Sequence, residues 1–152
     1  MANVSLTTLL STWRTAERRW EGASGSEEVQ ARALDVIAAW VAYQDAALPP
    51  GTQEFMLVTD GTGMYVGATA GVLGILGYEP SDLVGRRVVD IAAPDLRATT
   101  PSQWAEFVAD GRQDGAFRLC AADGTLVDLQ FQARAHHPVP GFHMSRLWPK
   151  DR

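Results

Sequence analysis

The hydrophobic pattern of this 152-residue chain changes its period at residues 49–51, where the sequence reads Pro-Pro-Gly. Before this break, apolar residues recur at helical spacing, first over residues 6–20 and then over residues 29–47. After it, short apolar runs alternate with polar residues, as they do in strands. Because proline lacks the amide hydrogen that continues a helix, the break predicts a boundary between a helical extension at residues 1–50 and a second unit at residues 51–150.

The apolar stripe of the second predicted helix allows two interpretations. It extends over about three heptads, which suits a helix packed on its own domain and equally suits a dimerisation seam. The stripe consists of Val29, Ala33, Val36, Trp40, Tyr43 and Ala47. In the dimer interpretation, Val29, Val36, Trp40 and Tyr43 form the helical face between two copies of the chain.

The last hundred residues predict five strands. Two short apolar runs flank the turn residues 60–63, which is typical of a hairpin. Short helical segments follow up to residue 110, and the chain then alternates over residues 115–121, 125–135 and 142–148. This order predicts an α+β fold in which a single antiparallel sheet is flanked by short helices.

Composition argues against several kinds of chemistry and partner. The only lysine is Lys150 and the only cysteine is Cys120, so Schiff-base chemistry, a phosphate-binding Gly-Lys loop, a disulfide framework and a multi-cysteine metal site are disfavoured. The net charge of -5 predicts no nucleic-acid partner, since the only basic clusters are the pairs Arg18-Arg19 and Arg86-Arg87. No apolar run approaches the length that spans a bilayer, so we expect a cytoplasmic protein with no membrane segment.

No catalytic or metal constellation stands out. Ser145, His143 and Asp128 include the residue types of a nucleophilic triad, but Ser145 lacks the surrounding glycines of a nucleophile elbow. His136 and His137 are neighbours on a strand, where consecutive side chains point to opposite faces and cannot readily share a metal. We therefore predict no enzymatic activity, no catalytic residues and no metal site.

Residues 53–148 resemble a PAS domain. The resemblance is carried, in order, by the hairpin at residues 58–66, the stretch at residues 76–86 that reads LGYEPSDLVGR, the hairpin tip at residues 123–125 and the strand start at residues 141–143. One departure is Thr69, which stands where family members often have asparagine. We expect Thr69 to cap the helix that follows. The resemblance implies a PAS-like five-stranded antiparallel sheet with short helices, preceded here by the N-terminal helical extension.

The resemblance also implies a function. A PAS-like chain would act as a sensory or signalling domain that binds a small ligand or a protein partner and transmits the signal through its sheet and N-terminal helices. It would form a homodimer and act on an attached output module or a separate partner protein. Two alternatives stay open: an interaction or dimerisation module without a ligand, and a small cone-shaped enzyme of the ketosteroid-isomerase type. The isomerase alternative needs a carboxylate or a His–Asp pair in its pocket.

The resemblance leaves the cofactor unknown, since PAS domains hold haem, flavin, small carboxylates, fatty acids or nothing. A covalent flavin adduct is disfavoured because Cys120 lies on a predicted strand and not near residues 91–96, and haem bound by a helix histidine is disfavoured because residues 95–110 contain none. A small apolar pocket between sheet and helices is nevertheless possible, although each of its residues could equally be ordinary core. The expected lining is Met56, Val58, Val66, Leu73, Leu76, Val88, Ile91, Trp104, Phe107, Phe117, Leu119, Phe131 and Met144.

Overall fold

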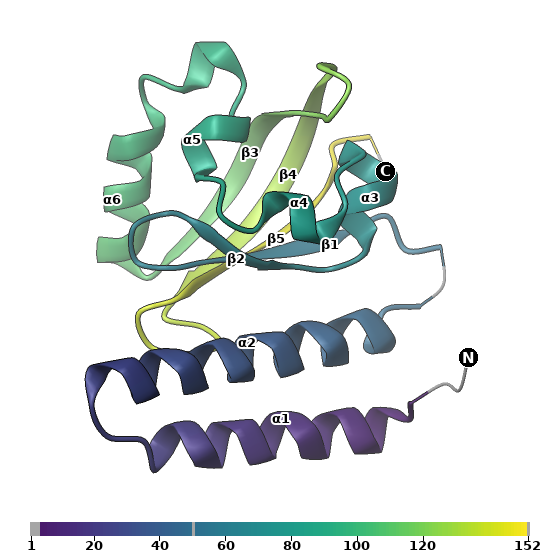
Figure 1. The fold of residues 1–152 in the computed structure, drawn as a ribbon. Coiled ribbons are helices and arrows are strands. Elements are labelled where there is room, and N and C mark those ends of the chain that lie inside the picture. The colour runs from purple at the N-terminus through teal and green to yellow at the C-terminus, as the bar shows by residue number, and fades with distance from the viewer. Residues whose placement is uncertain (1–3, 50, 152) are drawn as a thin grey trace.

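The computed structural model describes residues 4–49 and 51–151 and has three layers, in which a sheet lies between two N-terminal helices and a group of short helices (Figure 1). The N-terminal helices are α1 (Leu6–Glu21) and α2 (Ser26–Ala47). The strands are β1 (Phe55–Thr59), β2 (Tyr65–Ala68), β3 (Arg112–Cys120), β4 (Leu126–Ala135) and β5 (His143–Pro149). The short helices are α3 (Gly71–Leu76), α4 (Pro80–Leu83), α5 (Val88–Ile91), the 3-10 helix η1 (Pro94–Leu96) and α6 (Thr100–Asp110).

The five strands form one antiparallel sheet in the order β2-β1-β5-β4-β3. The two strands of each predicted hairpin, β1–β2 and β3–β4, are adjacent in this order. Strand β5 lies between the two hairpins, at the centre of the sheet. The predicted α+β fold with a five-stranded antiparallel sheet is thus confirmed. Helix α2 ends at Ala47, close to the predicted break, of which Pro50 lies outside the described residues.

The inner face of the sheet packs against α3 to α6 and forms the first of two apolar cores. Its fully buried side chains include Phe55 of β1, Leu83 of α4, Ile91 of α5 and Leu129 of β4. Since these side chains come from strands and helices far apart in sequence, their burial holds the hundred C-terminal residues together as one unit.

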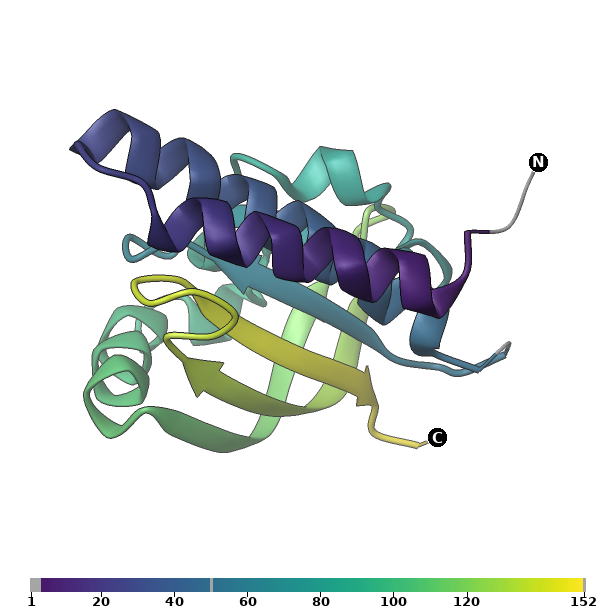
Figure 2. The same ribbon diagram turned by 90° about the horizontal axis from the view of Figure 1, so that it is seen from below.

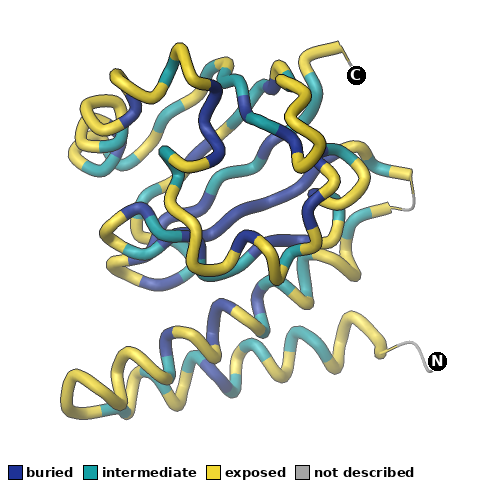
Figure 3. The backbone as a smooth tube through the Cα atoms, turned by 45° about the horizontal axis from the view of Figure 1, so that its top comes forward, coloured by how far each residue is buried: buried dark blue, intermediate teal, exposed yellow. Residues whose placement is uncertain are grey.

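Helix α2 packs on the outer face of the sheet, and α1 packs against α2 on the side away from the sheet (Figure 1, Figure 2). The second core joins Val36 and Trp40 of α2 to Val58 of β1 and Met144 of β5. Figure 3 shows that buried positions concentrate in the strands and recur along α2. Helix α2 is therefore sandwiched between the sheet and α1.

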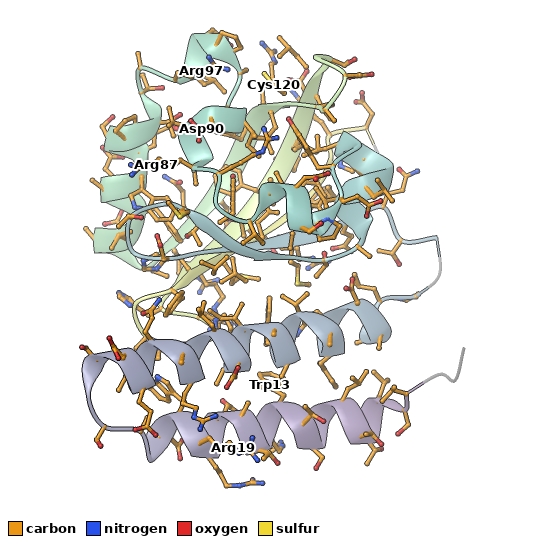
Figure 4. All side chains as sticks on the ribbon, viewed as in Figure 1. Trp13, Arg19, Arg87, Asp90, Arg97 and Cys120 are labelled. Carbon is orange, nitrogen blue, oxygen red and sulfur yellow. The ribbon has the colours of Figure 1, made fainter. Side chains whose placement is uncertain are left out.

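This packing corrects the predicted dimer face. Val36 is 0% exposed and Trp40 is 2% exposed within a single chain, so neither is available to a second copy. Tyr43 packs against Trp13 of α1 with ring centroids 5.5 Å apart, and Trp13 lies between the two helices (Figure 4). Of the four predicted seam residues, only Val29 remains exposed, at 37%. The stripe is used for packing the helix on its own chain, which is the other interpretation that its spacing allowed.

Thr69 does not cap α3 as predicted, but ties β1 to the segment after β2. Its hydroxyl oxygen accepts a hydrogen bond from the Met56 amide at 2.8 Å, and its own amide donates to the Met56 carbonyl at 2.9 Å. The amide of Ala70, at the start of α3, instead donates to the carboxylate of Asp45 at 2.8 Å. Because Asp45 lies near the end of α2, this bond connects the N-terminal helices to α3.

Candidate ligand cavity

A cavity of about 80 Å³ lies between the inner face of the sheet and α6. The sheet supplies one wall through side chains that share a face because they alternate along paired strands. Leu57 of β1 pairs with Ser145 of β5, and Ser145 in turn pairs with Ala133 of β4. Phe131 pairs with Leu147 two positions further along the same face.

Helix α6 supplies the opposite wall. Thr100, Gln103, Trp104 and Phe107 are spaced three and four residues apart, so they share one face of the helix and all line the cavity. The rings of Trp104 and Phe107 meet edge to face, with centroids 5.6 Å apart and planes at 67°. The cavity thus lies between two surfaces that are both rich in aromatic rings.

Several polar side chains line the cavity, and most have no partner. Within the described part of the chain, the side chains of Tyr65, Gln103, Gln113 and Ser145 make no hydrogen bond, while the Thr100 hydroxyl donates to the Leu96 carbonyl at 2.7 Å. Burial raises the pKa of Tyr65, and the nearby charge of Asp90 raises it further, so the phenol stays protonated. The unpartnered groups are neutral hydroxyls and amides that could bond to a molecule in the cavity.

The structure places six of the thirteen residues predicted for the pocket on the cavity wall. Those six are Val88, Trp104, Phe107, Phe117, Leu119 and Phe131.

The other predicted positions do not line this cavity, for three reasons. Met56, Val58 and Met144 point to the outer face of the sheet and pack in the core formed with α1 and α2, as Val66 does. Leu76 and Ile91 are buried in the inner core but do not reach the cavity. Leu73 is 46% exposed on the surface of α3.

Nine residues that line the cavity were not predicted, although helical spacing indicates two of them. Starting from Trp104 and Phe107, helical spacing back by four residues gives Thr100 and Gln103. These two residues, and most of the other seven, have polar side chains. A prediction based on apolar side chains therefore leaves them out. The missed residues are Leu57, Thr59, Tyr65, Thr100, Gln103, Gln113, Ala133, Ser145 and Leu147.

His143 lies beside the cavity and connects its helical wall to a loop. Its side chain is buried, and its ring meets those of Trp104 at 5.4 Å and Phe107 at 5.9 Å between centroids. Its Nδ1 accepts a hydrogen bond from the His136 amide at 3.0 Å. The next residue, His137, packs edge to face on Trp40 of α2 at 5.7 Å. A continuous series of contacts therefore leads from α6 through residues 136–143 to α2.

Acid disfavours this arrangement of histidines. Burial lowers the pKa of His143 and the charge of His136 lowers it further, against an opposing contribution from Asp60. Burial likewise lowers the pKa of His137, with Arg134 acting in the same direction. The folded chain therefore binds these protons less readily than the unfolded chain, for which the ordinary value is 6.5.

We expect the free energy of unfolding to fall as the pH drops below about 6.5, because protons then favour the unfolded chain. The measurement is the urea midpoint between about pH 7.5 and pH 5.5, followed by far-ultraviolet circular dichroism. The double variant His137→Gln, His143→Gln should lose much of this dependence while carboxylate titration at lower pH is retained. An unchanged slope in the double variant would assign the acid sensitivity to other groups.

The described residues offer no obvious metal site or membrane segment. No three His, Cys, Asp or Glu side chains among residues 4–49 and 51–151 gather where they could bind a metal ion. Cys120 lies on β3, with its sulfur 3.8 Å from the Ala92 carbonyl oxygen. None of the helices described is both long and apolar enough to cross a bilayer.

Comparisons with known proteins agree with this architecture. A family model described as "PAS fold" matches residues 65–141, just over half of the chain. The PAS domain of a protein from Colwellia psychrerythraea is 17% identical, with a TM-score of 0.61 over 74% of this chain and 99% of that one. The PAS domain of a LuxR-family transcriptional regulator from Burkholderia thailandensis, solved in complex with ethanol, is 12% identical, with a TM-score of 0.55 over 67% of this chain and 93% of that one. No curated protein sequence matches the chain.

Proposed function

The chain belongs to the PAS fold family, and we propose that it is a sensory domain that takes a small molecule into the cavity under α6 and signals through its N-terminal helices. Membership of this family supports a sensory or signalling role in general. The observation that supports ligand binding is the cavity itself, whose walls combine aromatic rings with unpartnered polar groups. The Burkholderia PAS domain was solved with ethanol, and we propose a ligand that is also small.

The contacts around His143 support a route for the signal. A ligand that moves α6 would move Trp104 and Phe107 against the His143 ring. His143 would in turn shift residues 136–142 through the His136 amide, and His137 would carry the change to Trp40 of α2. Such a shift needs only that the ligand favours one of two arrangements of these contacts over the other.

The cavity can be closed by one substitution with a matched control. Ala133 lines the cavity from β4, so Ala133→Leu would fill part of it, at a cost in stability of about 1–3 kcal/mol. Ala116 on the neighbouring strand β3 is exposed and pairs with Gln130 on the outer face, so Ala116→Leu adds the same side chain away from the cavity. We expect small molecules found by ligand-observed NMR to lose binding in Ala133→Leu and to keep it in Ala116→Leu.

Amide hydrogen exchange then tests the signal. A molecule that depends on Ala133 should change exchange rates in residues 136–143 and in α2 of the unmodified chain. If no molecule depends on Ala133, the cavity is not a ligand site. If a molecule binds there and leaves α2 unchanged, the proposed route is wrong while ligand binding stands. Native mass spectrometry and an absorption spectrum of freshly purified protein would reveal a ligand that survives purification.

The isomerase-type alternative finds no support in the cavity wall. That class of enzyme needs a pocket carboxylate or a His–Asp pair, and the residues that line this cavity supply neither.

Homodimerisation, and action on an output module or a separate partner, stay predictions. Helix α2, with α1 packed on it, covers the outer face over β2, β1 and part of β5, whereas polar side chains of β3 and β4 remain exposed there. The exposed polar side chains on this face include Arg112, Asp114, Asp128, Gln132 and Arg134. A partner that binds the sheet directly would meet these residues. Sedimentation velocity over a wide range of concentration would show whether the chain itself dimerises.

A further inference from the structure

We propose that the cavity under α6 selects an uncharged ligand, about the size of one substituted aromatic ring, that carries a hydroxyl or amide group. This inference rests on the proposed function, because it names the class of molecule that the same cavity would take.

The absence of charge on the cavity wall sets the first condition. Among the described residues that line it, none carries a charge. An ion entering the cavity would give up part of its water without gaining a countercharge, which disfavours it relative to a neutral molecule of the same shape. His143 packs edge to face against Trp104 and Phe107 beside the cavity, and burial lowers its pKa, which favours the neutral imidazole. Neither an anion nor a cation therefore has a fixed partner.

The aromatic rings and the volume set the second condition. Phe117 and Phe131 meet edge to face at 6.4 Å and 89°, as Trp104 and Phe107 do at 5.6 Å on the opposite wall. A further flat ring can join such an arrangement through the same contacts. The volume of about 80 Å³ limits the enclosed part of a ligand to about one ring, since a cavity of about 150 Å³ suffices for benzene.

The unpartnered polar groups set the third condition. Tyr65, Gln113 and Ser145 line the cavity, and their side chains have no hydrogen-bond partner among the described residues. Hydrogen bonds to buried or half-buried groups of this kind favour a ligand that satisfies them over one that cannot. A hydroxyl or amide on the ring fits these donors and acceptors and keeps the ligand neutral.

Isosteric probes separate charge from shape. Benzyl alcohol and benzamide are neutral, benzoate is an anion and benzylammonium is a cation, and all four carry one ring with a short polar substituent. We expect NMR titration of the full chain to show both neutral probes binding at least about tenfold more tightly than either ion, which is about 1.4 kcal/mol. Binding of the neutral probes should disappear in Ala133→Leu and persist in Ala116→Leu.

Two outcomes would overturn the class of ligand. One is an ion that binds as tightly as the neutral probes and also depends on Ala133. The other is that none of the four probes binds the cavity. Aromatic faces can hold cations, so benzylammonium is the more demanding comparison. If Ala133→Leu does not fold, nuclear Overhauser effects between probe protons and the Trp104 indole locate the probes in the unmodified chain.

The polar condition has its own test. Toluene lacks the polar group of benzyl alcohol. The dissociation constant of toluene divided by that of benzyl alcohol therefore measures what the polar group contributes to binding. We expect this ratio to fall at least about threefold in one or more of Tyr65→Phe, Gln113→Leu and Ser145→Ala. An unchanged ratio in all three variants would contradict the role of these side chains.

Failure of this inference is distinguishable from failure of the proposed function. If an ion, or a molecule of another class, proves to need Ala133, the cavity remains a ligand site and only the class of ligand is wrong. If no molecule of any class needs Ala133, both proposals fall together.

Discussion

Replacing Gly71 with alanine is expected to destabilise the fold by about 3 kcal/mol or more. A Cβ atom at this position would lie well under 3.0 Å from the carbonyl oxygen of Glu54, a distance that real Cβ atoms essentially never show. The obstructing atom belongs to the backbone just before β1 and cannot rotate away. The paired hydrogen bonds between Met56 and Thr69 hold these two segments together, so neither can move apart cheaply. Urea unfolding of the two proteins measures the difference in free energy.

Gly74 is the matched control in the same helix. A Cβ there would have no other atom within 4 Å, and the backbone of Gly74 needs no positive φ. Gly74→Ala should therefore stabilise α3 by about 0.5–1 kcal/mol through the higher helix propensity of alanine. Opposite signs for the two variants would assign the effect at Gly71 to the close approach of the backbone. Equal effects would mean that the loss of glycine itself, and not the contact, matters.

The fold could be predicted where the sequence gives a strand or helix one apolar face and one polar face. Along β3 and β4, apolar and charged residues alternate, which predicts Phe117 and Leu119 on one face and Arg118 on the other. The structure pairs Phe117 with Leu129 and Arg118 with Asp128, as that alternation requires. Turn residues such as Gly124, which has a φ of +88°, marked where the strands end.

The cavity could be predicted only in part, because β1 shows no such polarity. All five of its residues are buried, since helices cover both faces of the sheet at this strand. Met56 and Val58 are as apolar as Leu57, so composition does not tell which of them faces α6. That choice depends on α1 and α2 lying on the outer face, which is a long-range arrangement that no local pattern contains. The same packing decided between the two interpretations of the α2 stripe.

Replacing Trp40 with alanine is expected to cost about 3–5 kcal/mol, the range for removing a large buried aromatic side chain. Trp40 is 2% exposed and fills the second core together with Val58 and Met144. It also holds the ring of His137, so its loss would remove the contact through which residues 136–143 reach α2. Circular dichroism during urea unfolding measures the cost, and amide exchange in α2 shows whether the helices loosen on the sheet.

Leu34 on the same helix provides the comparison, because its side chain is 40% exposed and Leu34→Ala should change stability by no more than about 0.5 kcal/mol. If Trp40→Ala costs no more than Leu34→Ala, the N-terminal helices do not belong to the cooperative unit of the fold.

The same two variants also separate ligand binding from transmission of the signal. Since Trp40 does not line the cavity, a folded Trp40→Ala protein should still bind a neutral probe, but the probe should no longer change amide exchange in α2. Retention of that change would show that the signal reaches α2 by a route other than His137, for example through the bond from Asp45 to the start of α3.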